Sequence, residues 1–142
     1  MRYLPVWNMD RQAMAKGIAA GLLVCFLPVP GQTVLAAFLV YLIRGNLPAA
    51  ILATWVSNPI TFLPINLLIC AIGAWVMNEQ AALPTYLPSL SWSDIYAWIA
   101  SLSKAYLVGL PILSLNAALL GYVLAYVCWP YITSWKKTVK TL

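Results

Sequence analysis

The sequence predicts an all-α integral membrane protein, built from helices that prolines break or fold back (re-entrant helices) and from a transmembrane helix toward the C-terminus. The chain of 142 residues is 63% hydrophobic and only 8% charged, whereas soluble domains carry about 25% charged residues. A large apolar core does not explain this composition, because a chain of this size exposes much of its surface. Three uncharged stretches also exceed the ~20 residues that a spanning helix needs: 17–43, 45–78 and 105–135.

The first stretch is interrupted near its middle. Pro28, Pro30 and Gly31 fall within four residues there, a combination that ends a helix rather than bending it. The sequence therefore predicts one apolar helix over 17–27 and a second over 32–43. Each half reaches across only about half of a ~30 Å hydrocarbon core.

The second stretch is interrupted at Asn58-Pro59. Asparagine at the N-cap followed by proline at the first helical position is a strong helix start, so a new helix is predicted to begin at Pro59. Between the two broken stretches, Arg44-Gly45-Asn46 is predicted to form a turn, with Asn46 as a turn or cap residue.

The positive charges lie at the flanks of the apolar stretches: Arg2, Arg11 and Lys16 before the first, and Lys136, Lys137 and Lys140 after the last. Under the positive-inside rule both termini are predicted to be cytoplasmic, so the number of full crossings is even. Two arrangements satisfy this rule. Either the first broken stretch re-enters and the second crosses, or the first crosses and the second re-enters. Bases in flanking positions form no continuous basic face, so the expected partner is the lipid bilayer and not nucleic acid.

These patterns divide the chain into five parts: an amphipathic N-terminal segment (1–16), a paired broken-helix membrane domain (17–78), an external loop with an interfacial helix (79–104), a transmembrane helix (105–135) and a basic tail (136–142). The first apolar run also has features of a cleaved signal peptide. Cleavage after Ala36 would leave a chain that opens on an apolar run, so we expect the segment to be retained.

Catalytic chemistry lacks its usual side chains in this sequence. There is no histidine, and the only carboxylates, Asp10, Glu79 and Asp94, lie outside the apolar stretches. General acid–base catalysis and ordinary metal sites need such groups, and the serines and threonines have no base to activate them. We therefore expect neither an enzyme nor a metal or cofactor site.

The two interruptions indicate a binding site instead. Non-helical backbone at membrane depth is tolerated only beside protein or water, and interrupted segments in corresponding positions are typical of transporter sites. Two helices restarting there would point free N–H groups and partial positive charge into the membrane, which suits an anion such as a phosphate headgroup. The candidate substrate-binding side chains are Gln32, Arg44, Asn58 and Thr61.

Each candidate also has a structural interpretation. Asn58 is typical of a helix cap, and Arg44 of an anchor at the membrane interface. Gln32 and Thr61 are placed to bond backbone groups that nearby prolines free. The residues assigned a purely structural role, as breaks or caps, are Pro28, Pro30, Gly31, Asn46, Pro59 and Pro64.

Within residues 15–78, four short motifs follow one another: Pro28-x-Pro30-Gly31-Gln32, Arg44-x-Asn46, Asn58-Pro59-x-Thr61-x-x-Pro64, and Gly73. Together they resemble the bacterial inner-membrane family known as domain of unknown function 2062. The resemblance implies an inner-membrane location and no established activity. Some relatives are fused to glycosyltransferase-like domains, which implies work on envelope lipids or glycans. The chain departs from the family at Asn66 and Leu67, where aromatic residues are frequent.

Two functions of different classes follow. In the first, the chain binds or translocates an anionic substrate, such as a lipid-linked one, at the paired breaks, and so short a chain would form a homodimer to enclose a path. In the second, it is a non-transporting assembly or scaffold factor that docks an envelope enzyme through faces of small residues. These faces are Ala13, Gly17 and Gly21; Ala49, Ala53 and Ser57; and Ala117, Gly121 and Ala125.

Overall fold

The computed structural model describes residues 7–27, 31–78 and 104–139, which form five helices and no strand. The helices are α1 (Arg11–Cys25), α2 (Gln32–Ile43), α3 (Leu47–Thr54), α4 (Pro59–Met77) and α6 (Lys104–Val139). An all-α fold is thereby confirmed for this part of the chain. The predicted interfacial helix, and with it all of 79–103, lies outside the described residues, as do Pro28 and Pro30.

The helices restart where the sequence predicts. After the first break α2 begins at Gln32, and after the second α4 begins at Pro59. The first helix differs from the prediction because α1 begins at Arg11 rather than at residue 17. Its N-cap is Asp10, whose carboxylate accepts a hydrogen bond from the backbone N–H of Ala13 at 2.6 Å. The predicted boundary between 1–16 and 17–78 therefore falls inside one helix.

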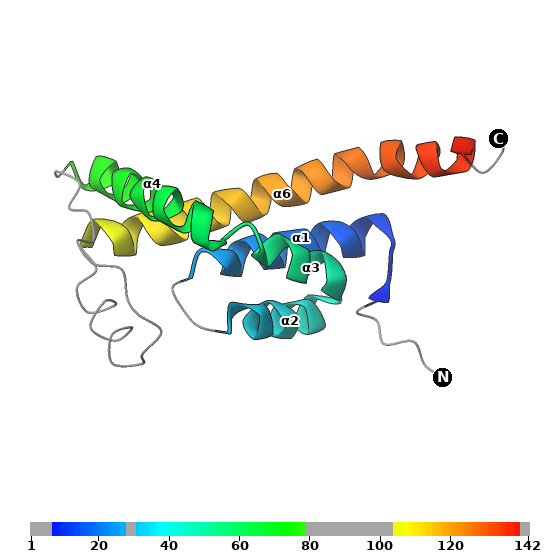
Figure 1. Cartoon of the computed structure of the whole chain (residues 1–142), viewed down its shortest axis with the longest axis horizontal. Helices are drawn as coiled ribbons and strands as arrows, with labels where there is room; N and C mark the ends of the chain where they lie inside the picture. Colours follow the sequence, from blue (N-terminus) through cyan, green and yellow to red (C-terminus); the bar gives the residue numbers. More distant parts are fainter. Residues whose placement is uncertain (1–6, 28–30, 79–103, 140–142) are drawn as a thin grey trace.

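The longest helix, α6, links two groups of helices (Figure 1). On one half of its length it packs against α1, and on the other half against α4. The short helix α3 packs on α1, and α2 lies against both α1 and α3. The first broken stretch thus folds back on itself as α1 and α2. α3, from the second stretch, joins them, while α4 pairs with α6.

Glycines bring α1 and α3 into backbone contact. A Cβ atom at Gly17 would meet the carbonyl oxygen of Asn46, and one at Gly21 would meet that of Ala50. Ala49 and Ala53 complete the contact from α3. Small residues four apart permit such an approach, so two of the predicted small-residue faces pack on each other inside this chain.

A second close crossing joins α4 to α6. A Cβ at Gly73 would meet the backbone of Ala105, and one at Gly109 would meet the carbonyl oxygen of Ile69. Close by, the hydroxyl of the buried Tyr106 donates a 2.8 Å hydrogen bond to Oδ1 of the buried Asn66. This crossing therefore combines backbone contact with a buried polar bond between side chains.

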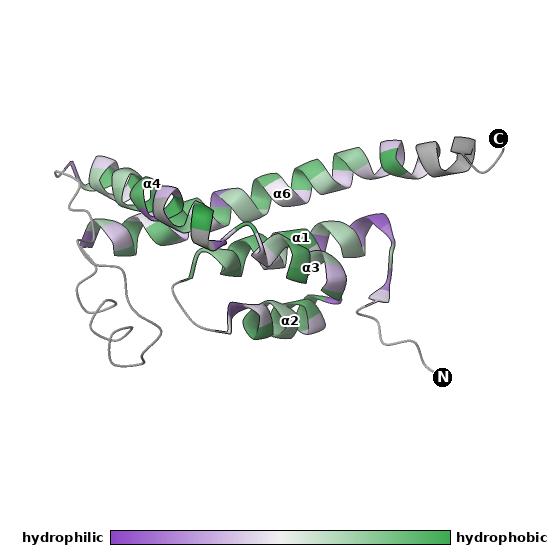
Figure 2. Ribbon diagram, viewed as in Figure 1, coloured by the Kyte–Doolittle hydropathy of each residue, from purple (hydrophilic) through white to green (hydrophobic). Residues whose placement is uncertain are grey.

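Most residues of the five helices are apolar (Figure 2). Two helices, over Ile60–Met77 and Lys104–Thr133, are long and apolar enough to cross a membrane, and α2, with 12 residues, is apolar but too short to cross alone. Large apolar side chains on α4 and α6 point outward: Ile60, Leu67, Leu68, Trp75, Val76, Leu107, Leu115, Leu119, Leu120, Val123, Leu124, Val127 and Ile132. Ile60 and Trp75 are 86% and 83% exposed, and contiguous apolar surface of this kind marks an interaction with a membrane or a partner.

Candidate functional site

The second break is a fully bonded helix cap. Oδ1 of Asn58 accepts from the backbone N–H groups of Ile60 and Thr61, at 2.9 and 3.0 Å. In return Oγ1 of Thr61 accepts from the backbone N–H of Asn58 at 2.9 Å, and its hydroxyl donates to the carbonyl of Val56. This reciprocal pair is a capping box. The structural interpretation of Asn58 and Thr61 therefore accounts for their hydrogen bonds, and they lie side by side.

The first break differs from the second in its bonding. The N-cap of α2 is Gly31, which has a left-handed φ of 85° and no side chain to cap the helix. The next residue, Gln32, has a buried Oε1 atom with no hydrogen-bond partner in the described part of the chain. The start of α2 thus keeps N–H groups that no side chain caps.

The four predicted binding residues do not converge on one point. Gln32 begins α2 and Arg44 follows its last residue, so about 18 Å of helix separates them. Asn58 and Thr61 begin a different helix, α4. An anion site that uses all four side chains at once is not assembled in this arrangement.

Asn46 is fully used in the structure. It is 1% exposed, and its Oδ1 accepts from the backbone N–H of Ala49 as the N-cap of α3. Its side-chain amide donates to the carbonyl of Asn8, and its backbone N–H donates to the carbonyl of Ala13. The prediction that Asn46 is a turn or cap residue is confirmed, and the residue also ties α3 to the start of α1.

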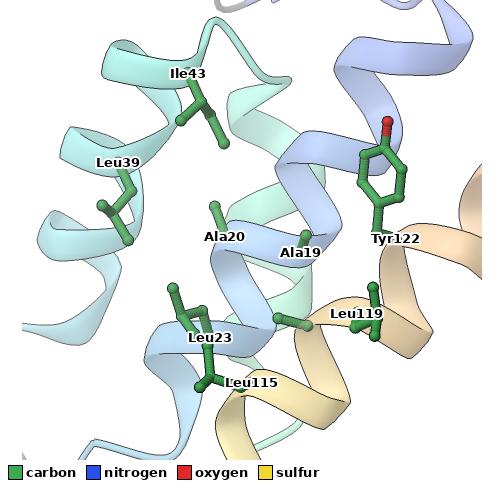
Figure 3. A pocket seen from close by; sticks show the side chains of 9 residues that line it. Ala19, Ala20, Leu23, Leu39, Ile43, Leu115, Leu119 and Tyr122 are labelled. Carbon is green, nitrogen blue, oxygen red and sulfur yellow. The ribbon is translucent and has the colours of Figure 1, made fainter. Parts of the chain in front are cut away.

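A groove runs between α1, α2 and α6 (Figure 3), with a volume of about 350 Å³. Its lining is hydrocarbon apart from one tyrosine hydroxyl: Ala19, Ala20, Leu23, Leu39, Ile43, Leu115, Ala118, Leu119 and Tyr122. The small side chains of the three alanines leave the space. The hydroxyl of Tyr122 and the side chain of Ile43 lie toward one end of the groove, and Leu23 and Leu115 toward the other.

Two cationic residues lie at the end marked by Ile43 and Tyr122. Arg44 directly follows Ile43 and is exposed. Lys16 precedes Ala19 and Ala20 by one helical turn, so it continues the stripe of α1 that lines the groove. The backbone next to Arg44 lies against Lys16, because the Cβ of Lys16 is 3.2 Å from the position that a Cβ on Gly45 would take.

A third cation, Arg11, contacts a tyrosine that stacks on Tyr122 at this end of the groove. The guanidinium carbon of Arg11 lies 3.6 Å from the ring centroid of Tyr126, and its Nε donates to the Tyr126 carbonyl at 2.5 Å. That carbonyl is available because Pro130, four residues later, has no N–H to offer it. The Tyr126 ring stacks on that of Tyr122, with centroids 6.0 Å apart and an 8° interplanar angle. Tyr122 belongs to the groove wall.

We call Arg11, Lys16 and Arg44 the basic corner. The only carboxylate among the described residues is Asp10, whose oxygens accept from Ala13 and from Asn8. The corner therefore keeps a net positive charge at the end of an uncharged groove. Such an arrangement suits a molecule with an anionic head and an apolar tail, because each part meets its complementary surface.

Arg44 also stands in an unusual conformation. It follows the last residue of α2 with a left-handed φ of 54°, at a position where glycine is usual because a Cβ is disfavoured there by about 1–2 kcal/mol. The equivalent residue after α4 is Asn78, with a φ of 53°, and asparagine tolerates this region better than arginine. An arginine in a disfavoured backbone conformation supports a use for its side chain.

The sequence predicts Arg44 as a ligand, but it predicts Arg11 and Lys16 only as charges that set membrane topology. It does not predict the groove. The charges themselves were visible, and so was the carbonyl that Pro130 frees. Their convergence was not, because it depends on how α1, α2 and α6 pack. The packing pair Ala105 and Gly109 was also missed, although these two small residues are four apart, the spacing used elsewhere in the chain.

A family model described as "Uncharacterized protein conserved in bacteria (DUF2062)" matches residues 2–138. The chain therefore belongs to this family, which confirms the resemblance and extends it from residues 15–78 to nearly the whole chain. No curated protein and no solved structure matches the chain.

Proposed function

We propose that the chain is a multi-pass inner-membrane protein that binds an anionic, lipid-linked substrate. Two observations support this proposal: the chain belongs to a bacterial family, and its basic corner lies at the end of an apolar groove. Translocation of that substrate is the stronger form of this proposal. The observation that carries it is the placement of Arg11, Lys16 and Arg44 beside the groove. The sequence alone predicted a binding site at the paired breaks. The proposed binding site is the basic corner instead.

The apolar outer surface supports membrane embedding. In water, the exposed leucines, isoleucines and valines of α4 and α6 would each remain hydrated at a cost of about 1.5–3 kcal/mol relative to burial. Lipid removes this cost. Lipid also supplies no hydrogen bonds, which suits helices whose breaks at Asn46 and Asn58 are satisfied by caps.

Helix lengths favour one of the two topologies. α4 and α6 are long enough to cross, whereas α1, α2 and α3 have 15, 12 and 8 residues. The first broken stretch is then a re-entrant hairpin, α4 crosses outward and α6 crosses back. Both termini and the basic corner lie on the cytoplasmic side, where Lys and Arg are enriched, and Lys104 lies outside.

Lipid binding is tested on the full chain in phosphatidylcholine nanodiscs that contain a minor fraction of phosphatidylglycerol, with native mass spectrometry as the readout. Each basic residue near a lipid surface is worth about 1 kcal/mol toward an anionic lipid. K16A and R44A are therefore each expected to lower phosphatidylglycerol retention about fivefold. The matched control is K104A, a cation at the opposite end of α6, which should change retention little. Equal effects of all three variants would contradict binding at the basic corner.

Membrane embedding and topology have a separate test. Single cysteines on a cysteine-free background are labelled in intact cells with an impermeant thiol reagent, at positions 31–46, at 57–64 and beside Lys104. Labelling near Lys104 and protection of positions near Arg44 are expected. The reverse pattern would overturn the topology, and uniform labelling of all sites would overturn the embedding.

The competing function, a scaffold for an envelope enzyme, has less support. Its docking faces were the three sets of small residues, and two of these pack on each other where α1 meets α3. In the third set, a Cβ at Gly121 would meet the side chains of Leu22 and Ile18 of α1. Faces already used within the chain are not free to receive an enzyme.

A further inference from the structure

We infer that the groove between α1, α2 and α6 is the seat of one hydrocarbon chain of an anionic phospholipid whose phosphate lies at the basic corner. This inference rests on the proposed function and names the part of the substrate that the proposed function leaves open. The proposed function places the headgroup at the basic corner, and this inference places the tail in the groove.

The wall of the groove admits a hydrocarbon tail and little else. No charged side chain lines it, and the Tyr122 hydroxyl is its one polar side-chain group. A peptide placed there would lose water around its amide groups without gaining hydrogen bonds in return. A methylene chain has no such groups. Its contacts with alanine and leucine side chains would be dispersion contacts, which an empty groove would forfeit.

The groove has room for one hydrocarbon chain. Its volume of about 350 Å³ is near the lower end of small-molecule sites, which span about 300–1,000 Å³. Ala19 and Ala118 are small, while Leu23 and Leu115 stand at the far end from Tyr122 (Figure 3). A tail that enters beside Tyr122 therefore meets hydrocarbon along the whole groove.

The charges fix the orientation of the lipid. Hydrocarbon gains little free energy in moving from a bilayer into a protein groove, because lipid tails are as apolar as leucine. The preference for one lipid must then come from its head. Lys16 and Arg44 lie at one end of the groove only, so the phosphate is at that end and the tail points toward Leu23 and Leu115.

The test uses a phosphatidylglycerol analogue with a photoactivatable diazirine in the middle of one acyl chain, added to the full chain in phosphatidylcholine nanodiscs. After illumination, the adduct is located by peptide mass spectrometry. We expect it within 19–23 or 115–122. We also expect unlabelled phosphatidylglycerol to compete with it and inorganic phosphate not to compete. An adduct confined to exposed residues outside these two ranges, such as Leu67, Leu107 and Val127, or full competition by phosphate, would overturn the inference.

Groove-filling variants provide the second arm. A118F and A19L place side chains in the space that the tail would occupy and are each expected to lower the groove adduct about fivefold or more, the change that a steric penalty of ~1 kcal/mol produces. The matched control A71L adds the same kind of bulk on an exposed position of α4 and should leave the adduct unchanged. Two variants are used so that a folding defect in one, seen by size exclusion, leaves the other to decide.

The two proposals fail in different ways. If A118F and A19L remain folded and keep the groove adduct, the tail seat is wrong, while a loss of phosphatidylglycerol retention in K16A and R44A would still support headgroup binding. If retention is unchanged in K16A and R44A, the proposed function fails, and with it an inference that depends on a phosphate at the corner.

Discussion

The crossing of α1 with α3 and the crossing of α4 with α6 both depend on close backbone contact at glycines, but they differ in the hydrogen bonds that accompany this contact. In both, glycines let one helix backbone touch the next: Gly17 and Gly21 in the first crossing, Gly73 and Gly109 in the second. The first adds backbone and cap bonds through Asn46. The second adds a side-chain bond between Asn66 and Tyr106.

The difference follows from helix length. α3 has 8 residues, too few to be stable alone, so it relies on a buried cap and on contact with α1. α4 has 19 residues and completes its own backbone bonds except beside Pro64. Its crossing therefore needs to fix only orientation and depth relative to α6, which one directional side-chain bond can do. Four predictions test this comparison.

The largest effect is expected at Gly73. G73L would drive a side chain into the backbone of Ala105, which cannot move away without displacing α6. Overpacking of cores costs about 1–3 kcal/mol and more where backbone must shift, so we expect most of the folded protein to be lost on size exclusion in detergent. The control is A71L, on the exposed side of the same helix. Comparable losses in both would show that bulk on α4, rather than the crossing, is responsible.

A smaller loss is expected at Gly21. G21L would meet the Ala50 carbonyl and the Ala53 side chain, but α3 is short and can shift while α1 stays packed on α6. We expect a destabilisation of about 1–3 kcal/mol, measured as a lower thermal midpoint in detergent, with folded protein still recovered. Q12L, on an exposed position of α1, is the control. A loss as complete as that of G73L would contradict the idea that α3 can yield.

The third prediction concerns the buried cap. N46A removes bonds to Ala49 and Asn8 from a residue that is 1% exposed, so we expect a loss of about 2 kcal/mol, near the upper limit for caps. N58A removes an exposed cap and should cost about 0.5–1 kcal/mol. Chemical denaturation in mixed micelles measures both. The comparison fails if N58A is the more damaging variant.

The smallest effect is expected for the side-chain bond of the second crossing. A double-mutant cycle over N66L and Y106F isolates the Asn66–Tyr106 interaction. Interhelical hydrogen bonds in membrane proteins average about 0.6 kcal/mol, with a maximum of about 1.7, and the coupling measured here should fall in that range. A coupling near zero would assign the stability of the α4–α6 crossing to its glycines alone.

Much of the local structure could be predicted from the sequence. Gly31 and the Asn58-Pro59 pair fixed where α2 and α4 begin, because these residues act on their own backbone. Asn46 was identified as a turn or cap residue for the same reason. The start of α1 was placed six residues too late, since the apolar pattern begins at Gly17 while the helix is set by the cap at Asp10.

The candidate site could be predicted only in part. Two of the four proposed ligands, Asn58 and Thr61, bond each other in a capping box, and Gln32 lies at the far end of α2 from Arg44. Arg11 and Lys16 were known as charges of the N-terminal segment. Nothing in their spacing indicated that they would lie toward the same end of the groove as Arg44, which follows the last residue of α2.

The sequence by itself determined the helical class, the two restarts and the apolar surface, because propensity, capping and hydrophobicity depend on a residue and its near neighbours. Only the tertiary structure decided which small residues touch, where the groove opens and which cations gather at its end. Those features arise from contacts such as Arg11 with Tyr126, 115 residues apart. Contacts over such separations depend on the packing angles of whole helices, and no local pattern encodes them.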